Sequence, residues 1–374
     1  MGQARRGASS SMGRLERTKG SGGINSVERN GKNGPPRGKD VPLAEKKGLF
    51  SKEGQESVVA VVVTYNRKNL LLECLAGLSR QSRPIDGLVL VDNASTDGTP
   101  SLLFEQGIID RLPQEQSATI QEFVTRPKLL GGIPTLALRM NENTGGSGGF
   151  HEGLKRAYLE GADWIWLMDD DIEPDAGCLE GLLSFSEISR CLHPRKYFQN
   201  GVAHEWEGYY DLRTGRRIFQ EDPSFKKGFA FCTTNTGCFE GMLVHRSIVD
   251  LLGYPDRRFF IGMDDSLYGF MAHFHTPVLY LRDPFVTKKA DAPKGYVPIS
   301  NRSLYYGMRN AFLFKETFDR LVPKDRAVRS FYLRVKFVDY ALNILQNRDK
   351  KIEGFRWLVR GWRDGRKGRF GRGL

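Results

Sequence analysis

Three consecutive aspartates, Asp169, Asp170 and Asp171, directly follow a largely apolar run at residues 163–168. Such a run is typical of a buried strand, and adjacent carboxylates repel one another unless a cation lies between them. If the chain stays extended, the first and third side chains point the same way while Asp170 faces elsewhere. Asp169 and Asp171 could then share one hard divalent ion with the phosphates of a substrate. A solvated acidic turn is the alternative, and the position at a strand end favours the functional interpretation.

A second acidic pair, Asp264 and Asp265, follows an apolar stretch at residues 259–263. One carboxylate of such a pair could take a proton from an attacking hydroxyl, because a neighbouring acid raises its pKa toward the useful range for a base. Ordinary capping of the next helix is the alternative interpretation of this pair.

Two polar loops also contain candidate ligand-binding residues. Asp92 opens a loop rich in Asn, Ser and Asp at residues 92–99, where it could bind a nucleobase or ribose or only serve turn and capping chemistry. The segment Asn143–Gly149 could be a flexible turn, or its glycines could let the backbone approach an anionic ligand at a helix N-terminus. It matches neither the dinucleotide-binding nor the P-loop fingerprint.

The elements that would position these residues form a repeated strand-loop-helix pattern. We expect strands at 57–63, 87–91, 135–139 and 163–168, with helices starting near 70, 101 and 150 between them. Polar residues follow the carboxyl end of each strand, which is the ligand-binding edge of an open doubly wound sheet. The pattern therefore predicts that the separate loops meet at one cleft.

The second half of the chain is less regular. We expect a hairpin at 209–219, a strand at 237–244 and helices at 266–274, 325–347 and around 355–362, with the 325–347 helix packing one apolar face. Tyr305, Tyr306, Arg309 and Asn310 could either pack in the core or line an acceptor site. The five cysteines include no Cys-x-x-Cys pair, which favours buried free thiols.

Charge is distributed unevenly along the 374 residues, whose formal net charge is +12. Residues 1–56 carry 12 Lys and Arg against 6 Asp and Glu, and residues 350–374 carry 9 against 2, so the remainder is nearly neutral. A neutral body argues against an extended nucleic-acid-binding face. The segment 1–56 is poor in apolar residues and is predicted to be a disordered basic tail. We expect a cytoplasmic protein, because the chain shows neither an apolar signal core nor a membrane-spanning run.

The ordered set of motifs resembles family 2 glycosyltransferases with the GT-A fold, an α/β architecture with a mostly parallel, Rossmann-like doubly wound sheet. The matching stretches are Val61–Arg67, Val91–Thr99, Met168–Asp171 and Phe260–Asp265. The stretches Asn143–Phe150 and Gly161–Asp171 look most like the branch of galactofuranosyl and rhamnosyl transferases. The resemblance implies a GT-A domain at 57–310, with a nucleotide-sugar half (57–175) and an acceptor and catalytic-base half (176–310), followed by a basic helical extension (311–374).

The resemblance also implies roles for individual residues. Asp265 would be the base of an inverting transfer, with Asp264 beside it, and Asp169 and Asp171 would bind a divalent cation, Mn²⁺ or Mg²⁺. The residues that would contact the nucleotide-sugar are Thr64, Asn66, Arg67, Asp92, Asn93, Asn143, Gly145, Asp169 and Asp170.

The implied reaction moves galactofuranose from UDP-galactofuranose to a glycan or lipid-linked glycan of the cell envelope. dTDP-rhamnose is the second choice of donor, and a non-catalytic sugar-nucleotide-binding module is the rival. One departure bears on the donor: galactofuranosyltransferases of this type usually carry a metal-binding histidine some two dozen residues beyond the acidic pair. Here that region contains Lys288 and Lys289 instead.

The basic C-terminal segment combines Phe355, Trp357, Leu358, Val359 and Trp362 with several arginines. A basic amphipathic helix of this kind can lie in the interface of an anionic membrane, which would place the enzyme peripherally on the inner face. A helix docked on the body of the protein is the alternative.

Overall fold

The computed structural model describes residues 48–115, 117–204, 208–219, 225, 228–294 and 297–373. Most of the predicted basic tail, residues 1–47, lies outside the described residues. The last part of that predicted tail, residues 48–56, packs onto the domain. Phe50 is only 2% exposed and lies against Gly87, and the indole of Trp164 donates to Glu56 at 2.7 Å. The packed residues 48–56 thus lie outside the tail as far as the structure describes it, because Phe50 and hydrogen bonds to Glu160 and from Trp164 fix this segment to the domain.

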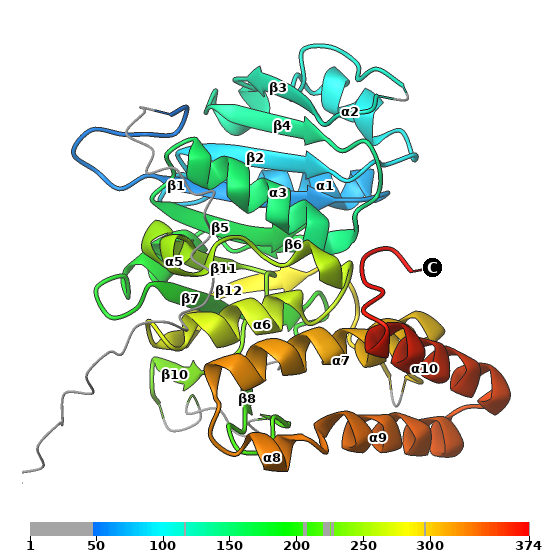
Figure 1. Cartoon of the computed structure of the whole chain (residues 1–374). Helices are drawn as coiled ribbons and strands as arrows, with labels where there is room; N and C mark the ends of the chain where they lie inside the picture. Colours follow the sequence, from blue (N-terminus) through cyan, green and yellow to red (C-terminus); the bar gives the residue numbers. More distant parts are fainter. Residues whose placement is uncertain are drawn as a thin grey trace, which may run out of the picture. The chain divides into compact units, whose positions relative to one another are not determined.

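The architecture is a large mixed sheet with helices on both faces and a helical unit at the C-terminal end (Figure 1). In chain order the strands are β1 (Val58–Thr64), β2 (Gly87–Asp92), β3 (Gln121–Thr125), β4 (Thr135–Arg139), β5 (Trp164–Asp169), β6 (Ile172–Pro174), β7 (Cys191–Phe198), β8 (Gly208–Tyr210), β9 (Arg217–Phe219), β10 (Phe231–Thr234), β11 (Met242–His245) and β12 (Val278–Lys288). The helices are α1 (Lys68–Ser79), α2 (Thr99–Glu105), α3 (Gly145–Leu159), α4 (Cys178–Leu183), α5 (Arg246–Leu252), α6 (Asp264–Ala272), α7 (Asn301–Leu321), α8 (Arg326–Arg329), α9 (Tyr332–Asn347) and α10 (Lys351–Arg366), with 3-10 turns η1 (Lys128–Leu130) and η3 (Arg257–Phe259).

Within the described part of the chain the main sheet has ten strands, in the order β10-β12-β7-β11-β5-β1-β2-β4-β3 with β6 beside β12. The four strands β5, β1, β2 and β4 are mutually parallel and coincide, within a residue at each end, with the four strands predicted from apolar runs. A separate hairpin of β8 and β9 confirms the turn expected at residues 209–219. The predicted fold class is confirmed.

Alternating side chains of the parallel strands divide the core into two layers. Val58, Ala60 and Val62 face helices α1, α2 and α4, whereas Val59, Val61 and Val63 face α3, α5 and α6. A strand covered on both faces needs apolar residues at every position, which explains the unbroken run of β1.

The glycine-rich segment at 145–149 is the first turn of α3 and not a flexible turn. A side chain at Gly149 would meet Val63 at 2.5 Å, so its glycine lets α3 approach β1 closely. The helix predicted at 101–112 is shorter than expected, because α2 ends at Glu105 and Gly107 follows with φ of 66°.

The second half of the sheet was only partly predicted. β12 runs for 11 residues parallel to β7, but the charged sequence Arg282-Asp283-Pro284 interrupts it and coincides with a shift of register. The strand expected at 237–244 is confined to β11, because residues 237–241 form the loop that leads into it. These elements position residues that the parallel half cannot supply.

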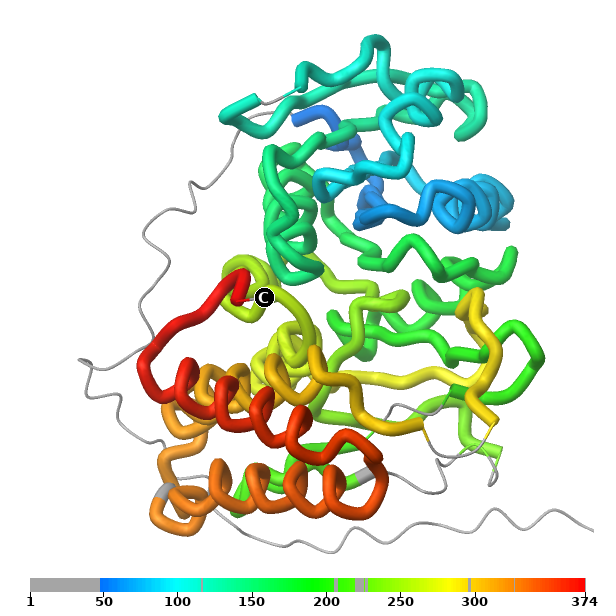
Figure 2. The backbone as a smooth tube through the Cα atoms, turned by 90° about the vertical axis from the view of Figure 1, so that its right-hand side faces the viewer, coloured from blue at the N-terminus to red at the C-terminus, as the bar shows by residue number. Residues whose placement is uncertain are grey.

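Helices α7, α9 and α10 pack alongside one another beyond the sheet, in both views (Figures 1 and 2). The boundary expected between 310 and 311 falls inside α7, so the helical unit starts at Asn301. Within the described part of the chain, none of the helices combines the length and apolar character that a membrane span requires. All five cysteines are buried and free, as predicted.

Candidate active site

The carboxyl ends of the parallel strands bring the predicted polar residues to one edge of the sheet. Thr64 at the end of β1 is in register with Asp92 of β2, and Val63 is in register with Asp169 of β5. The convergence expected from the strand-loop-helix pattern is therefore observed.

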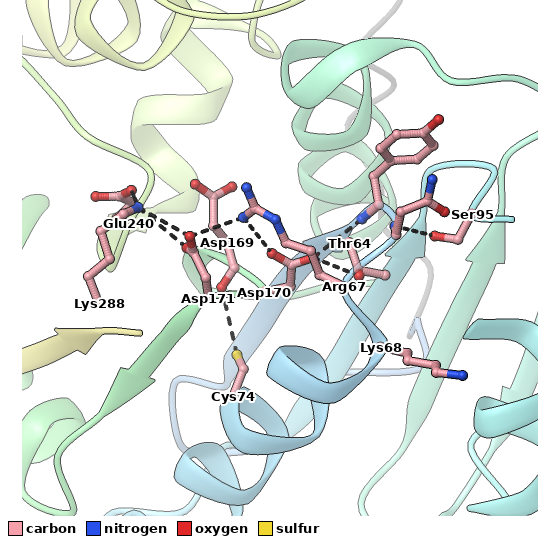
Figure 3. A network of polar contacts seen from close by, with 12 residues as sticks. Thr64, Arg67, Lys68, Cys74, Ser95, Asp169, Asp170, Asp171, Glu240 and Lys288 are labelled. Carbon is pink, nitrogen blue, oxygen red and sulfur yellow. Dashed lines mark hydrogen bonds and ion pairs between the residues drawn. The ribbon is translucent and has the colours of Figure 1, made fainter. Parts of the chain in front are cut away.

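Asp170 turns away from its two neighbours toward β1 (Figure 3). It is 3% exposed, accepts a hydrogen bond from the hydroxyl of Thr64 at 2.7 Å and pairs with Arg67 at 3.2 Å. The backbone N–H of Tyr65 also donates to it, at 3.3 Å. Asp170 thus fastens the loop after β1 to the end of β5. It faces away from Asp169 and Asp171, as expected, although the chain forms a turn at 170 and 171 and is not extended there.

Asp169 and Asp171 form an acidic cluster with Glu240. One carboxylate oxygen from each of the three lies within 4.8 Å of the others. Burial and the negative charges of Glu240 and Asp171 raise the pKa of Asp169 well above its ordinary value. Among the described residues Asp169 forms no salt bridge, although the charge of Lys288 acts against the rise in its pKa.

Sequence reasoning missed Glu240, which lies in the loop immediately before β11. The only signal was a lone carboxylate in the otherwise apolar run Phe239-Glu240-Gly241-Met242. The loop brings it beside β5 because β11 pairs antiparallel with that strand, with Met242 opposite Leu167.

Lysine and arginine side chains surround the acidic cluster (Figure 3). Lys288, the last residue of β12, forms an ion pair with Glu240 and lies 3.3 Å from Asp171, which Arg67 also contacts at 3.0 Å. Lys196 pairs with Glu240 from the buried face of β7. Although burial opposes it, these two lysines lower the pKa of Glu240 to about 2, so Glu240 stays ionised.

The two lysines that stand where a histidine was expected have different surroundings. Lys288 contacts the acidic cluster, whereas Lys289 pairs with Glu73 and Glu173, both at 2.8 Å, beside α1 and β6. Only Lys288 is thus positioned to compete with a cation or to neutralise a diphosphate at the cluster.

The predicted nucleotide residues of the β1 and β2 loops bond to one another. Asp92 is 2% exposed, accepts from the N–H of Ser95 at 2.9 Å and pairs with Arg139. Asn66, whose φ is 56°, accepts from the N–H of Thr96 at 2.6 Å. Turn chemistry, the alternative interpretation of this loop, is therefore present in the structure, and nucleotide contact by these two side chains stays a prediction.

Asn93, Asn143 and Gly145 join β2 to the start of α3. The Asn93 side chain donates to the carbonyl of Gly145 at 2.9 Å and accepts from the N–H of Thr144 at 3.0 Å, and Asn143 accepts from the N–H of Gly145 at 2.8 Å. A Cβ at Gly145 would lie 1.9 Å from the carbonyl oxygen of Phe260, and its φ is 74°. Only glycine fits this position, which ties the nucleotide half to the loop before α6.

Asp264 and Asp265 occupy the first turn of α6. Asp264 is 8% exposed, and burial followed by the charge of Asp265 raises its pKa to about 7. Burial also raises the pKa of Asp265, against a hydrogen bond from the N–H of Ser266 at 2.6 Å. The charges of Glu240 and Lys196 act on Asp265 as well, so the acid pair and the acidic cluster share one electrostatic environment.

The loop that precedes Asp264 is held by α7. The amide of Asn310 donates to the carbonyls of Phe259, Ile261 and Gly262 at 3.1, 2.9 and 3.0 Å. Arg309 adds a hydrogen bond to the carbonyl of Phe259 at 2.6 Å. The side chains of Arg309 and Asn310 are fully buried, and those of Tyr305 and Tyr306 are nearly so. All four residues therefore pack in the core, which was one of the two roles considered for them. The sequence did not predict that these residues hold the loop before Asp264.

Comparison with known proteins identifies the family. The family model described as glycosyl transferase family 2 matches residues 59–115 and 120–250. Galactofuranosyltransferase GlfT1 of Mycolicibacterium smegmatis is 33% identical over 217 residues, which is 56% of this chain and 63% of that protein. GlfT1 of Mycobacterium tuberculosis is 31% identical over 214 residues, 56% of this chain and 62% of that protein. The match thus spans less than two thirds of these relatives.

Solved structures with a similar fold are more distant in sequence. Residues 1–349 of Staphylococcus aureus TarS superpose with a TM-score of 0.51 at 15% identity, covering 83% of this chain and 80% of that one. GalNAc-T7 bound to UDP, GalNAc and Mn²⁺ gives a TM-score of 0.50 at 12% identity, covering 84% of this chain and 57% of that one. The strand order, the polar edge of the sheet and these matches together assign the chain to glycosyl transferase family 2, with the GT-A fold.

Proposed function

We propose that this glycosyltransferase inverts configuration as it moves galactofuranose from UDP-galactofuranose to a hydroxyl of a cell-envelope glycan or lipid-linked glycan. The observation that carries the proposal is the acidic cluster Asp169-Asp171-Glu240 at the carboxyl edge of the sheet, in electrostatic reach of Asp265. The choice of sugar is supported by the two relatives, which are named galactofuranosyltransferases and match 56% of this chain.

The donor set of the acidic cluster fits a divalent cation, Mn²⁺ or Mg²⁺. Its three carboxylates are hard oxygen ligands within 4.8 Å of one another, and Asp169 has a raised pKa and no ion pair among the described residues. We therefore assign Asp169, Asp171 and Glu240 as the ligands. When bound, the cation would offset negative charge on the leaving nucleoside diphosphate.

The protein side chains would bind the donor and move the acceptor proton. Asp265 would take the proton from the acceptor hydroxyl as that oxygen attacks the anomeric carbon. Asp264 would lie beside it, with a pKa raised by burial and by the charge of Asp265. Arg67 and Lys288 would add positive charge beside the diphosphate. The remaining proposed contacts with the nucleotide-sugar come from Thr64, Asn66, Asp92, Asn93, Asn143, Gly145, Asp169 and Asp170.

Lys288 favours one second candidate, a rhamnosyltransferase that uses dTDP-rhamnose. It stands in the region where a galactofuranosyltransferase would carry a metal-binding histidine, and it contacts two of the three proposed cation ligands. A different charge balance at the diphosphate is compatible with a different donor.

We place the enzyme in the cytoplasm, where nucleotide-sugars would reach it, with peripheral contact to the inner face of the membrane.

The test is release of nucleoside diphosphate by the purified full-length protein from UDP-galactofuranose, UDP-galactopyranose and dTDP-rhamnose. The proposal expects UDP release chiefly from UDP-galactofuranose, and it expects this release to be lost in Asp265→Asn. Preferential release of dTDP from dTDP-rhamnose would replace the donor. Tight nucleotide binding with no release from any donor would instead indicate a non-catalytic binding module.

A further inference from the structure

The outer face of α9 carries an apolar stripe that nothing in the described chain covers. Phe331, Val338, Leu342 and Leu345 are 57%, 52%, 48% and 49% exposed. Their spacing of seven, four and three residues puts them on one side of a helix. These four residues belong to the face that the sequence predicts to pack on the body, which comprises Val328, Phe331, Tyr332, Val335, Val338, Leu342 and Leu345. Of that face Tyr332 does pack, but the rest of the packed side is formed by other residues, among them Phe337 and Ile344.

The stripe continues onto α10. Ile352 and Val359 are 74% and 52% exposed and lie seven residues apart. A groove of about 370 Å³ between the two helices is lined by Arg334, Phe337, Val338, Val359 and Trp362. A second hollow on α10 also includes Val359, together with Ile352 and Arg356. The exposed apolar residues of α9 and α10 therefore form one surface, here called the α9–α10 face.

Positive charge surrounds this face. Residues 331–374 contain 12 Lys and Arg against 4 Asp and Glu, a net charge of +8. Arg334 and Arg356, which line the two hollows, are exposed and form no salt bridge with any described residue. Arg363 lines the α10 hollow too and has only a 3.7 Å contact with Asp364. The face thus combines an apolar centre with an arginine rim.

Charge decides between the possible occupants of the face. A second copy of this chain in a two-fold contact would bring the same arginine rim against itself, and the like charges would repel. An anionic bilayer offers the complement to both features, because apolar side chains can enter the interface while arginines meet the headgroups.

We infer that the α9–α10 face docks the protein on an anionic membrane surface. The inserting residues are the aliphatic side chains of α9 and α10 and Phe331, and not the aromatic residues of α10 suggested by its sequence. Phe355, Trp357 and Trp362 are partly buried against the helical core, so α10 is docked on the body, although Phe355 and Trp362 also line the hollows of the α9–α10 face. Membrane contact by α10 would therefore use its exposed aliphatic residues, Ile352 and Val359. This surface is independent of the donor and of the transfer reaction.

The test is sedimentation of the full-length protein with vesicles of phosphatidylcholine alone or mixed with phosphatidylglycerol, at low and raised salt. We expect binding to the anionic vesicles only, weakened by salt. The triple variant Arg334→Gln, Arg356→Gln, Arg363→Gln should lose binding on the order of 100-fold, about fivefold for each arginine. The triple variant Val338→Ser, Leu342→Ser, Val359→Ser should lose about tenfold or more through reduced apolar contact.

Matched controls distinguish this face from general surface effects. Leu251→Ser on α5 and Arg111→Gln after α2 change an exposed apolar and an exposed basic residue elsewhere, and both should bind like wild type. Absence of sedimentation at low salt, equal binding to neutral vesicles, or unchanged binding in both triple variants would overturn the inference. A dimer in ultracentrifugation that the serine variant dissociates, without vesicle binding, would make the face a self-association surface instead.

Discussion

Asp169 and Asp170 are neighbours in the chain but have different roles in the structure. Asp170 is bonded to Thr64 and Arg67 and holds two loops together, whereas Asp169 joins Asp171 and Glu240 in the acidic cluster. β5 ends at Asp169, and the turn at Asp170 and Asp171 separates the two environments. In the acid pair Asp264-Asp265, burial raises the pKa of both groups, and the charges of Glu240 and Lys196 act on Asp265.

The proposed base can be tested at this scale. Asp265→Asn should lower turnover on the order of 10²-fold or more, because the amide cannot accept the acceptor proton, while UDP binding measured by calorimetry stays near wild type. Asp264→Asn is the matched control and should lower turnover less. Normal turnover in Asp265→Asn together with a large loss in Asp264→Asn would transfer the role to Asp264.

Cation dependence is tested by chelation and by the adjacent lysines. EDTA should abolish transfer and Mn²⁺ or Mg²⁺ should restore it, because three carboxylates lie together at the cluster. Lys288→Ala should weaken donor use about 10- to 100-fold, the range expected for one charged hydrogen bond. Lys289→Ala, which alters only pairs with Glu73 and Glu173, should be near wild type. Full activity in EDTA would contradict the cation site and leave Lys288 as the neutralising group.

Among the elements, α7 has the most direct effect on the site from outside the sheet. The loop between η3 and α6 contains three residues with positive φ, namely Phe260, Gly262 and Met263, at 63°, 77° and 71°. Such a backbone persists only where its surroundings hold it. The Asn310 amide supplies that restraint, since it bonds three carbonyls of this loop.

Removing this restraint should affect turnover more than binding. Asn310→Ala should lower kcat about tenfold or more, because displacement of the loop shifts Asp265 from its productive position, with little change in UDP affinity. Asn301→Ala on the same helix removes bonds to Glu353 and Arg348 and should leave kcat unchanged. Equal kcat in the two variants, measured alongside thermal unfolding, would show that Asn310 serves stability alone.

At the scale of the whole molecule, segments distant in sequence complete the domain. The first described residues pack beside β2 through Phe50. The last ones return to η3, just before the loop that leads to Asp264, where the N–H of Gly371 donates to the carbonyl of Arg258 at 2.8 Å. Phe50→Ala should therefore reduce the free energy of unfolding by about 3–5 kcal/mol, the range for a buried aromatic side chain.

The control is Phe104→Ala on α2, where the ring is 46% exposed and the change should stay within about 0.5 kcal/mol. Urea unfolding at equilibrium measures both values. A Phe50→Ala variant as stable as the control would show that the segment 48–56 adds nothing to the fold.

The sequence by itself determined the parallel half of the sheet and its polar edge. β1, β2 and β5 are nearly continuous apolar runs, because strands covered on both faces have few polar positions, and the ends of β2 and β5 are marked by Asp92 and Asp169. These signals are local and need no knowledge of distant contacts. They predicted the fold class and, together with the motifs that resemble family 2 glycosyltransferases, the acidic residues of the site other than Glu240.

Only the tertiary structure decided the partners of those residues. Lys288 reaches Asp171 across 117 positions of sequence, and Glu240 and Asn310 join the site from a loop and a helix with no motif of their own. Packing against α7 and α10 likewise decided which apolar side of α9 is buried. The spacing of Phe331, Val338 and Leu342 is as suitable for burial as that of the residues that pack, yet these three side chains are exposed. Periodicity shows that a face is apolar, but contact between distant elements decides whether that face is covered.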